Sequence, residues 1–340
     1  MSAGAPGRYS RQELFAGIGP EGQRRLRAAR VLVVGCGALG SCLAEMLTRA
    51  GVGSLTVVDR DYVEPSNLQR QSLFEEADAE RGLPKAVAAE TRLRRLNSEV
   101  ALSGIVADVT AENADGLVDR ADLVLDGTDN FETRFLLNDV CVRLGVPWVY
   151  GACVGAHGLA LLVRPGETPC LRCVLGERPE PGAGPTCDTA GVVAPIAHVV
   201  AGIQAGEALK LLAGRKESLL PGMAMVDLWN GSFEVMLLAG VAPRCPGCVE
   251  GRFEAPPPAG TVLCGRDAVQ ISAPPGVRLD LAALARRLAP AGAVSANEHL
   301  VRFSAEGGAE LAIFGDGRAI VKGVGDPARA RGLYAKYVGA

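Results

Sequence analysis

The sequence lacks the features that would point to a membrane or to a nucleic acid. No uncharged apolar run reaches the roughly 18 residues of a transmembrane helix. Lys and Arg number 35 against 38 Asp and Glu, and the net charge of −3 recommends neither nucleic acid nor an anionic membrane as a partner. No apolar segment of the secretory type follows residues 1–6. We therefore expect a cytoplasmic protein without a nucleic-acid or membrane partner.

Histidine is scarce and cysteine is not. The three histidines are scattered among apolar residues, and we expect no catalytic role for them. Ten cysteines in a chain without a recognisable secretion signal indicate a reducing compartment and roles in metal binding or chemistry. Five of them lie in apolar runs or small-residue turns, where we expect buried packing residues: Cys36, Cys42, Cys141, Cys153 and Cys264.

Two C-x-x-C pairs are the most informative motif. Cys170 and Cys173 form the first pair, and Cys245 and Cys248 form the second, far along the chain. Together they offer four thiolates, the ligand set of a closed tetrahedral zinc site. A redox-active pair is the alternative, but a thioredoxin-type site needs one pair, not two. The spacing favours a structural zinc ion that joins two distant segments of one domain.

Short apolar runs alternate with helical patterns through the first 250 residues. Runs at 30–34 and 54–59 have the character of buried strands, and 38–50 between them has helical apolar spacing. This alternation predicts an α/β fold, a Rossmann-like, doubly wound, mostly parallel sheet. The pattern continues with helices at 85–96, 131–144 and 194–212, strands at 100–106, 123–126, 148–150 and 159–163, and a hairpin of 223–228 with 233–238.

A proline-rich segment divides the chain. Residues 253–260 contain three consecutive prolines, which favour an extended linker. We expect a nucleotide-binding domain with the zinc site over 8–252 and a small α+β domain over 261–340. The second domain carries no ligand cluster, so we expect a packing or partner-binding role. Its predicted elements are a strand at 261–271, a helix at 281–288, a strand at 299–303, a strand pair around 315–317 and a helix at 327–337.

A G-x-G-x-x-G motif lies directly between a predicted strand and a predicted helix. Its glycines, Gly35, Gly37 and Gly40, let the backbone approach a phosphate at the helix N-terminus, where N–H groups and the dipole favour anions. Asp59 ends the next strand, at a distance suited to ribose hydroxyls. The motif alone predicts a nucleotide site of unspecified kind, and it most commonly indicates an NAD-dependent dehydrogenase.

The residues that follow discriminate between nucleotides. Arg70 and Lys85 add two cations, which a triphosphate requires and a nicotinamide dinucleotide does not. Asp129 follows a parallel strand, where ligands of open α/β sheets bind, and a carboxylate beside phosphates usually holds Mg²⁺. Simpler interpretations are that Arg70 is a solvated loop charge and that Asp129 caps the following helix.

These motifs, taken in chain order, resemble the ThiF/MoeB/HesA family, prokaryotic relatives of ubiquitin-activating enzymes. The resemblance covers roughly residues 8–250, and the tail from about 260 resembles an extension on some ThiF-like proteins. The matching segments are Arg8-Tyr-Ser-Arg-Gln12, Gly35 to Gly40, Asp59-Arg-Asp61, Ser66-Asn-Leu-Gln-Arg-Gln71, Pro84-Lys85, Thr128-Asp-Asn130, both C-x-x-C pairs, and Thr186-Cys187 leading to Gly191-Val-Val-Ala-Pro195.

The resemblance implies an activity. Such enzymes adenylate the C-terminal Gly-Gly carboxylate of a ubiquitin-like sulfur carrier, ThiS- or MoaD-like, in thiamine or molybdenum cofactor biosynthesis. A carboxylate is already an anionic nucleophile, so the enzyme must supply in-line positioning and charge neutralisation rather than a general base. The resemblance further implies ATP, Mg²⁺ and Zn²⁺ as cofactors, a homodimer, and a cysteine desulfurase or rhodanese as sulfur donor.

The family's roles transfer to matching positions. The glycine loop would take phosphate, Asp59 would hold ribose, and Asp129 would ligate Mg²⁺. The residues implied in nucleotide binding are Gly35, Gly37, Gly40, Asp59, Asn67, Arg70, Lys85, Asp129 and Asn130.

Two further roles depend on the resemblance alone. Arg11 would reach into the ATP site of the partner subunit, and the alternative is an exposed charge on the N-terminal helix. Cys187 would accept the activated carrier as a thioester or acyl-persulfide, although not every relative depends on this position. Its proximity to a predicted helix N-terminus could lower its pKa, and a spare loop thiol is the alternative.

Three functions therefore compete. A sulfur carrier adenylyltransferase uses all the motifs. An NAD-dependent oxidoreductase would use only the glycine loop and lacks a hydride-transfer constellation. A non-catalytic, zinc-stabilised binding module would leave the cations and Asp129 without a role. The ThiF-like tail favours thiamine among the pathways.

Overall fold

The computed structural model describes residues 7–179, 187–238, 244–253, 262–263, 268–273 and 276–339. Contacts between Cα atoms divide the chain into two compact units. The first comprises Met1–Glu80, Pro84–Pro179 and Gly191–Glu254, and the second comprises Arg81–Leu83, Glu180–Ala190 and Ala255–Ala340. The expected linker, 253–260, lies almost wholly outside the described residues, and the domain boundaries that we drew stay a prediction.

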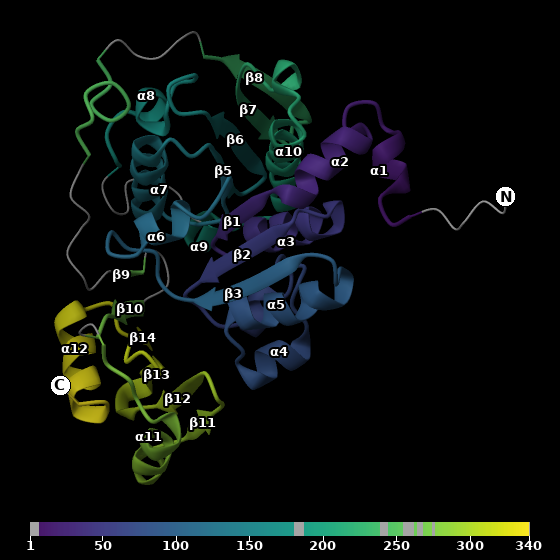
Figure 1. The fold of residues 1–340 in the computed structure, drawn as a ribbon. Coiled ribbons are helices and arrows are strands. Elements are labelled where there is room, and N and C mark those ends of the chain that lie inside the picture. The colour runs from purple at the N-terminus through teal and green to yellow at the C-terminus, as the bar shows by residue number, and fades with distance from the viewer. Residues whose placement is uncertain are drawn as a thin grey trace, which may run out of the picture. The chain divides into compact units, whose positions relative to one another are not determined.

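An eight-stranded mixed sheet forms the centre of the first unit (Figure 1). The strand order is β3-β2-β1-β4-β5-β6-β7-β8, parallel from β3 to β5 and antiparallel from β5 to β8. The predicted Rossmann-like sheet is confirmed, with an antiparallel extension. Its strands are β1 (Arg30–Val34), β2 (Ser54–Asp59), β3 (Ala101–Val106), β4 (Leu123–Asp126), β5 (Trp148–Val154), β6 (His157–Val163), β7 (Gly222–Asp227) and β8 (Ser232–Leu237).

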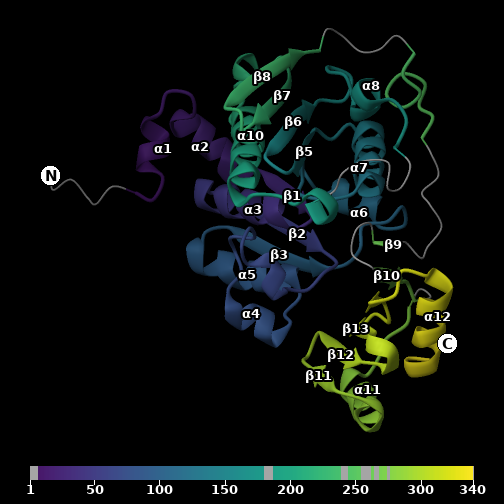
Figure 2. The same cartoon turned by 180° about the vertical axis from the view of Figure 1, so that it is seen from behind.

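Helices cover both faces of this sheet (Figures 1 and 2). On one face, α3 (Ala38–Ala50), α5 (Lys85–Leu96) and α10 (Ala194–Leu212) pack against the strands and one another. On the other, α6 (Ala114–Val118), α7 (Phe131–Leu144) and α8 (Leu171–Leu175) cover a core that includes Phe135 and Trp148. The first unit also contains α1 (Ser10–Leu14), α2 (Gly19–Ala28) and α4 (Glu76–Arg81) up to Glu80, whereas α9 (Cys187–Ala190) belongs to the second unit.

The order of the strands determines where a ligand can bind. The chain leaves β1 for α3 on one face and leaves β4 for α7 on the other, although β1 and β4 are neighbours. Such a reversal opens a crevice at the carboxyl ends of the two strands, the usual binding place in open α/β sheets. Both predicted nucleotide loops, 35–40 and 126–130, begin at this edge.

The second unit is built on a six-stranded antiparallel sheet in the order β11-β12-β13-β14-β10-β9. Helices α11 (Leu281–Leu288) and α12 (Pro327–Tyr337) pack on it over a core that includes Phe303 and Leu311. The predicted α+β character is confirmed. Its strands are β9 (Val262–Leu263), β10 (Ala268–Ile271), β11 (Val294–Ala296), β12 (Leu300–Ser304), β13 (Glu310–Phe314) and β14 (Ala319–Lys322).

One element of the second unit was predicted wrongly. We expected a single strand over 261–271, but β9 and β10 pair with each other in antiparallel register, so the chain reverses between them. Apolar residues on both sides of the reversal concealed it in the sequence. The short strand β11 was not predicted.

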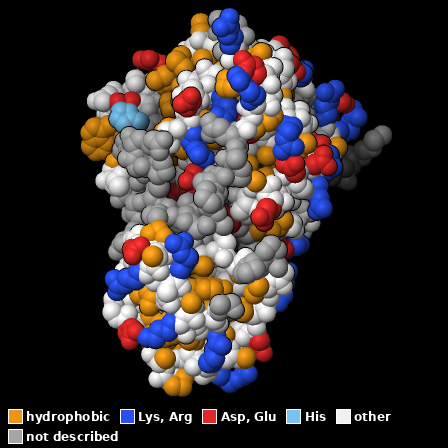
Figure 3. All heavy atoms as spheres, turned by 90° about the vertical axis from the view of Figure 1, so that its left-hand side faces the viewer, with side chains coloured by type: hydrophobic (Ala, Val, Ile, Leu, Met, Phe, Trp, Pro, Cys, Tyr) orange, Lys and Arg blue, Asp and Glu red, His pale blue; other side chains and the backbone are white. Residues whose placement is uncertain are grey.

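Two surface properties complete the description. Among the described helices, none is long and apolar enough to cross a membrane. On the face in Figure 3, acidic and basic side chains are intermixed among the described residues rather than gathered by sign.

Candidate nucleotide site and cysteine cluster

Glycines bring the two loops of the crevice into backbone contact. Gly35 has φ +84°, and a Cβ there would lie 2.7 Å from the carbonyl oxygen of Gly127. A Cβ on Gly40 would lie 1.8 Å from the Gly35 oxygen, and one on Gly127 would lie 2.6 Å from that same oxygen. No side chain fits at these three positions without moving the backbone. The loop after β1 is therefore packed directly against the loop after β4.

Gly37 differs from its two companions. A Cβ there would meet nothing closer than 3.9 Å, so packing within the protein does not require glycine at this position. Gly37 is the N-cap of α3, and no side chain caps that helix. The first N–H groups of α3 therefore lack a side-chain acceptor, which is the arrangement that binds phosphate at a helix N-terminus.

Asp59 is buried beneath the glycine loop. Its carboxylate accepts the N–H of Cys36 at 2.6 Å and that of Asp61 at 2.7 Å. Burial raises the pKa of Asp59, and the nearby Lys85 ammonium opposes that rise. In this structure the carboxylate orients the loop that would hold phosphate. Its contact with ribose stays a prediction.

Lys85 begins α5 and is almost completely buried, with 3% of its surface exposed. Its backbone N–H donates to the Asp61 carbonyl at 2.9 Å, and its Nζ lies 3.3 Å from Asp61 Oδ2. Asp61 thus positions a cation beside Asp59 at the crevice. Asp61 belongs to the family segment Asp59-Arg-Asp61, but the sequence alone predicts no role for it.

Asn67 and Arg70 lie in the connection between β2 and α4. Asn67 ends a short 3₁₀ helix (Pro65–Asn67) and is buried, and its Oδ1 accepts the N–H of Glu64 at 3.1 Å. Arg70 is half-buried, and its Nη1 donates to the Ser66 carbonyl at 2.8 Å. Both side chains are ordered by their own loop, and their contact with a triphosphate stays a prediction.

The loop after β4 separates two polar residues that the sequence left ambiguous. Asn130 is the N-cap of α7, and its Oδ1 accepts the N–H of Thr133 at 2.8 Å. The alternative that Asp129 caps this helix is therefore wrong. Asp129 is exposed at the loop instead, where a carboxylate can reach a metal ion.

A shared neighbour brings Asp61 and Asp129 to one side of the crevice. Burial lowers the pKa of Arg60, but Asp108, Asp61 and Asp129 together raise it above its ordinary value. Arg60 Nη1 lies 3.2 Å from Asp108 Oδ1. Acidic groups from the ends of β2, β3 and β4 thus surround one guanidinium. No sequence motif predicts this contact, because it joins segments that are distant in the chain.

A buried ion pair supports the β4 loop from below. Asp126, the last residue of β4, is fully buried, and its Oδ1 accepts the Thr128 N–H at 2.8 Å and the Thr128 hydroxyl at 2.7 Å. Arg134 Nε, on α7, lies 3.3 Å from Asp126 Oδ2. Neither residue was a candidate in the sequence. A charged residue that ends an apolar strand was the only available signal.

Arg11 is exposed on α1. Leu14 and Phe15 follow it with 73% and 65% of their surfaces exposed, so an apolar surface adjoins the arginine. A single chain does not test the role of Arg11 in a partner subunit, and both interpretations stay predictions.

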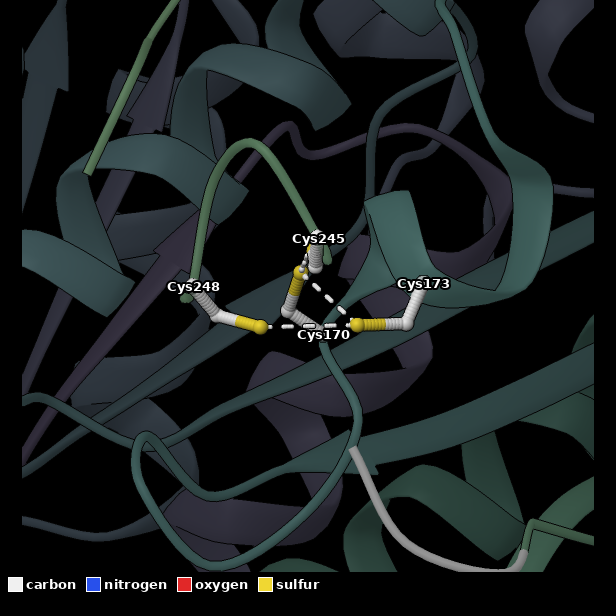
Figure 4. Close-up of side chains that lie close together, drawn as sticks. All are labelled: Cys170, Cys173, Cys245 and Cys248. Atoms are coloured by element: carbon white, nitrogen blue, oxygen red, sulfur yellow. Dashed lines mark hydrogen bonds between the residues drawn. The ribbon is translucent and has the colours of Figure 1, made fainter. Parts of the chain in front are cut away.

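The structure brings the four cysteines of the C-x-x-C pairs together (Figure 4). The Sγ atom of Cys170 lies 3.7 Å from the Sγ atom of Cys173 and 3.7 Å from that of Cys245. The Sγ atoms of Cys173 and Cys248 are 3.4 Å apart. All four lie within 4.8 Å of one another. A tetrahedral zinc ion about 2.3 Å from each sulfur needs sulfur separations of about 3.8 Å. The cluster fits zinc, and a lone redox pair does not account for it.

The surroundings of the first C-x-x-C pair affect both the charge and the position of its cysteines. Burial raises the pKa of Cys170 to about 11, and the neighbouring thiols add to the rise. A central cation would reverse this effect by stabilising the thiolates. Helix α7 anchors the first pair, because Asn138 Oδ1 accepts the Leu171 N–H at 2.8 Å and Asp139 binds Arg172 through two bonds of 2.8 and 2.7 Å.

The other cysteines are distributed as follows. Cys36, Cys42, Cys141 and Cys153 are buried, as predicted, and Cys264 lies outside the described residues. Cys187 is half-buried and begins α9, a helix of four residues that belongs to the second unit. Its role as carrier acceptor stays a prediction.

Comparison with known proteins agrees with this geometry. Residues 9–247 match the sequence model of the ThiF family. The "Sulfur carrier protein ThiS adenylyltransferase" of Bacillus subtilis is 48% identical over 98% of this chain and 99% of its own. The "SAMP-activating enzyme E1" of Haloferax volcanii is 43% identical over 73% of this chain and 90% of its own. The crystal structure of Escherichia coli MccB with ATP superposes with a TM-score of 0.63 at 26% identity, covering 72% of this chain and 75% of that one. The chain belongs to the ThiF family.

Proposed function

We propose that this protein is a sulfur carrier protein adenylyltransferase that transfers AMP from ATP to the C-terminal carboxylate of a ubiquitin-like carrier. One observation carries this proposal. At the crevice between β1 and β4, a glycine loop and the uncapped start of α3 adjoin a buried lysine and an exposed carboxylate, Lys85 and Asp129. A phosphate site with a cation and a metal ligand suits ATP better than a nicotinamide dinucleotide.

In the reaction, a carboxylate oxygen of the carrier attacks the α-phosphorus of ATP. The bond to the bridging oxygen breaks, pyrophosphate leaves with the electron pair, and an acyl-adenylate remains. The chain positions the phosphates through the N–H groups of α3 and balances their charge with Lys85 and Arg70. Asn67 and Asn130 complete the surroundings of the nucleotide. Mg²⁺, when bound, would be held by Asp129 and would neutralise charge on the phosphates.

The carrier is ThiS-like in this proposal, and the pathway is thiamine synthesis rather than molybdenum cofactor synthesis. The support is the Bacillus subtilis relative, whose similarity includes the second unit. A cysteine desulfurase or a rhodanese would supply the sulfur. The zinc ion has a structural role, because four protein ligands leave no open position. Cysteines held as thiolates require a reducing compartment, so we assign the protein to the cytoplasm.

We further propose that the protein is a homodimer. Its support is the apolar surface of Leu14 and Phe15 beside Arg11, which suits burial against a second copy. Arg11 would then reach the nucleotide of the partner subunit.

Mg²⁺-dependent exchange of labelled pyrophosphate into ATP tests the activity. We expect exchange with a ThiS-like carrier that ends in Gly-Gly and none with the same carrier lacking those two residues. Exchange without any carrier, or reduction of NAD by a substrate, would show that the assignment is wrong. If a MoaD-like carrier supported faster pyrophosphate exchange than a ThiS-like carrier, the proposed pathway would become molybdenum cofactor synthesis. The proposed reaction would stay the same.

A further inference from the structure

Arg134 lies directly beneath the loop that carries Asp129 and does not itself face solvent. Only 7% of its surface is exposed. Its Nη2 donates to two carbonyl oxygens, that of Thr128 at 2.8 Å and that of Gly151 at 3.3 Å. Its Nε forms the ion pair with Asp126. One side chain therefore joins the end of β4, the loop after it and the neighbouring strand β5.

The guanidinium is held in one orientation. Its central carbon lies 5.5 Å from the ring centroid of Phe131 and 5.5 Å from that of Tyr150. Burial raises the pKa of Asp126, and the Arg134 charge opposes that rise. A buried carboxylate and a buried guanidinium stabilise each other here, and removal of either would leave the other charge uncompensated.

We infer that Arg134 is a positioning residue for adenylation, and that it holds the 127–130 loop where Asp129 meets the metal ion. The carbonyl that it binds belongs to Thr128, the residue immediately before Asp129. Its hydrogen bond to Gly151 and its ion pair with Asp126 are made to the strands β5 and β4. Arg134 thus connects the loop to the sheet, together with the Asn130 cap, the Thr128 contacts with Asp126 and the Gly127 N–H, which donates to the Val34 carbonyl.

The bridge from Asp126 to the two carbonyl oxygens requires the planar guanidinium group of arginine. Arginine presents several donors in a rigid geometry, whereas lysine offers one compact charge on a flexible stem. A lysine at 134 keeps a positive charge near Asp126 but does not reproduce the bridge from the ion pair to two separate carbonyls. Arg134→Lys therefore separates the bridge from the charge, while Arg134→Ala would leave Asp126 buried alone.

The inference rests on the proposed function, because it assigns Arg134 a role through the metal ligand Asp129. Two measurements distinguish a failure of this inference from a failure of the proposed function. Hydrogen–deuterium exchange of the peptide over 126–133 reports loop order without any reaction, with β7 as an internal reference. Carrier-dependent pyrophosphate exchange, measured against Mg²⁺ concentration, reports the metal site. If the parent protein shows no carrier-dependent exchange, the proposed function fails, and the deuterium exchange alone then decides whether Arg134 orders the loop.

For Arg134→Lys we expect amides 128–130 to exchange with deuterium about tenfold faster and the half-saturating Mg²⁺ concentration to rise about tenfold, as for other residues that orient metal ligands. Arg143→Lys is the control, because Arg143 lies on the same helix but pairs with Asp115 at the surface. A second variant, Asp126→Asn with Arg134→Gln, removes both charges together and should behave in the same way if Arg134→Lys does not fold. Two results would overturn the inference. One is deuterium exchange at the parent rate in Arg134→Lys, and the other is faster deuterium exchange with an unchanged Mg²⁺ dependence of pyrophosphate exchange.

Discussion

The cysteine cluster and the nucleotide crevice are both anchored on α7, but they leave different groups exposed. At the cluster, four sulfurs face one another, and the supporting pair of Arg172 and Asp139 has side chains only 4% and 9% exposed. At the crevice the supporting pair, Arg134 and Asp126, is equally buried, yet Asp129 beside it is exposed. Both regions are built on buried ion pairs. At the cluster two cysteines are buried and two are half-buried, whereas the crevice presents an exposed carboxylate, Asp129, which is the metal ligand of our proposal.

The largest expected effect is on catalysis, at the exposed ligand. Asp129→Ala should lower carrier-dependent pyrophosphate exchange by about 10²–10³-fold or more, because it removes preorganised charge stabilisation. The melting temperature should stay near that of the parent, since an exposed loop residue contributes little to folding. Glu76→Ala, at an exposed position on α4, is the control for removal of a carboxylate. If Asp129→Ala kept pyrophosphate exchange at the parent rate, the exposed carboxylate would not distinguish the crevice from the cysteine cluster as the reactive region.

The second effect is on stability, at the closed cluster. Cys245→Ser should lower the zinc content and cost about 3–5 kcal/mol of folding free energy, because metal binding is coupled to folding. Zinc analysis of the purified variant and its thermal melting measure the two effects. Cys42→Ser is the matched control: its Sγ lies 3.6 Å from a serine hydroxyl, and it should retain zinc. Full zinc occupancy in Cys245→Ser would show the ligand set to be wrong.

The comparison also shows which features a sequence reveals. Helices α3, α10 and α12 were predicted to the residue, because Gly51 or a proline marks their ends locally. The glycine loop and each C-x-x-C pair are contiguous motifs, so they can be recognised in the sequence without knowledge of the fold. Contacts that no motif marks, between segments that are distant in the sequence, were not predicted. Arg134 meets Gly151 because α7 packs against β5, and Arg60 meets Asp108 because β2 and β3 are neighbouring strands. The supporting ion pairs were therefore missed, although Asp129 and the four cysteines beside them were candidates in the sequence.

A third ion pair lies at the opposite edge of the sheet, where the same two strands begin. Arg30 begins β1 and binds Asp122, just before β4, at 2.8 Å, with half-exposed side chains. Hydrogen bonding to Arg30 lowers the pKa of Asp122. A lowered carboxyl pKa stabilises the fold above the unfolded pKa of about 3.9, and the contribution disappears as the pH falls through the folded value.

Asp122→Asn should therefore cost less than about 1 kcal/mol at pH 7, since exposed pairs contribute little. The difference from the parent should vanish in strong acid. Urea unfolding at both pH values measures it, and pyrophosphate exchange should be unchanged, because this edge of the sheet carries no nucleotide loop. A loss of exchange would show that activity is not confined to the carboxyl ends of the strands.

The smallest expected effect is at Cys187, which belongs to neither region. Adenylate formation precedes any attack by a thiolate, so removal of a later nucleophile does not slow the earlier step directly. Cys187→Ala should keep pyrophosphate exchange at the parent level. If the cysteine accepts the activated carrier, mass spectrometry of the parent with carrier and ATP should show a reducible adduct that the variant lacks. If the parent forms no adduct and the variant still supports sulfur transfer, the crevice completes the reaction and the adenylate itself is the product handed on.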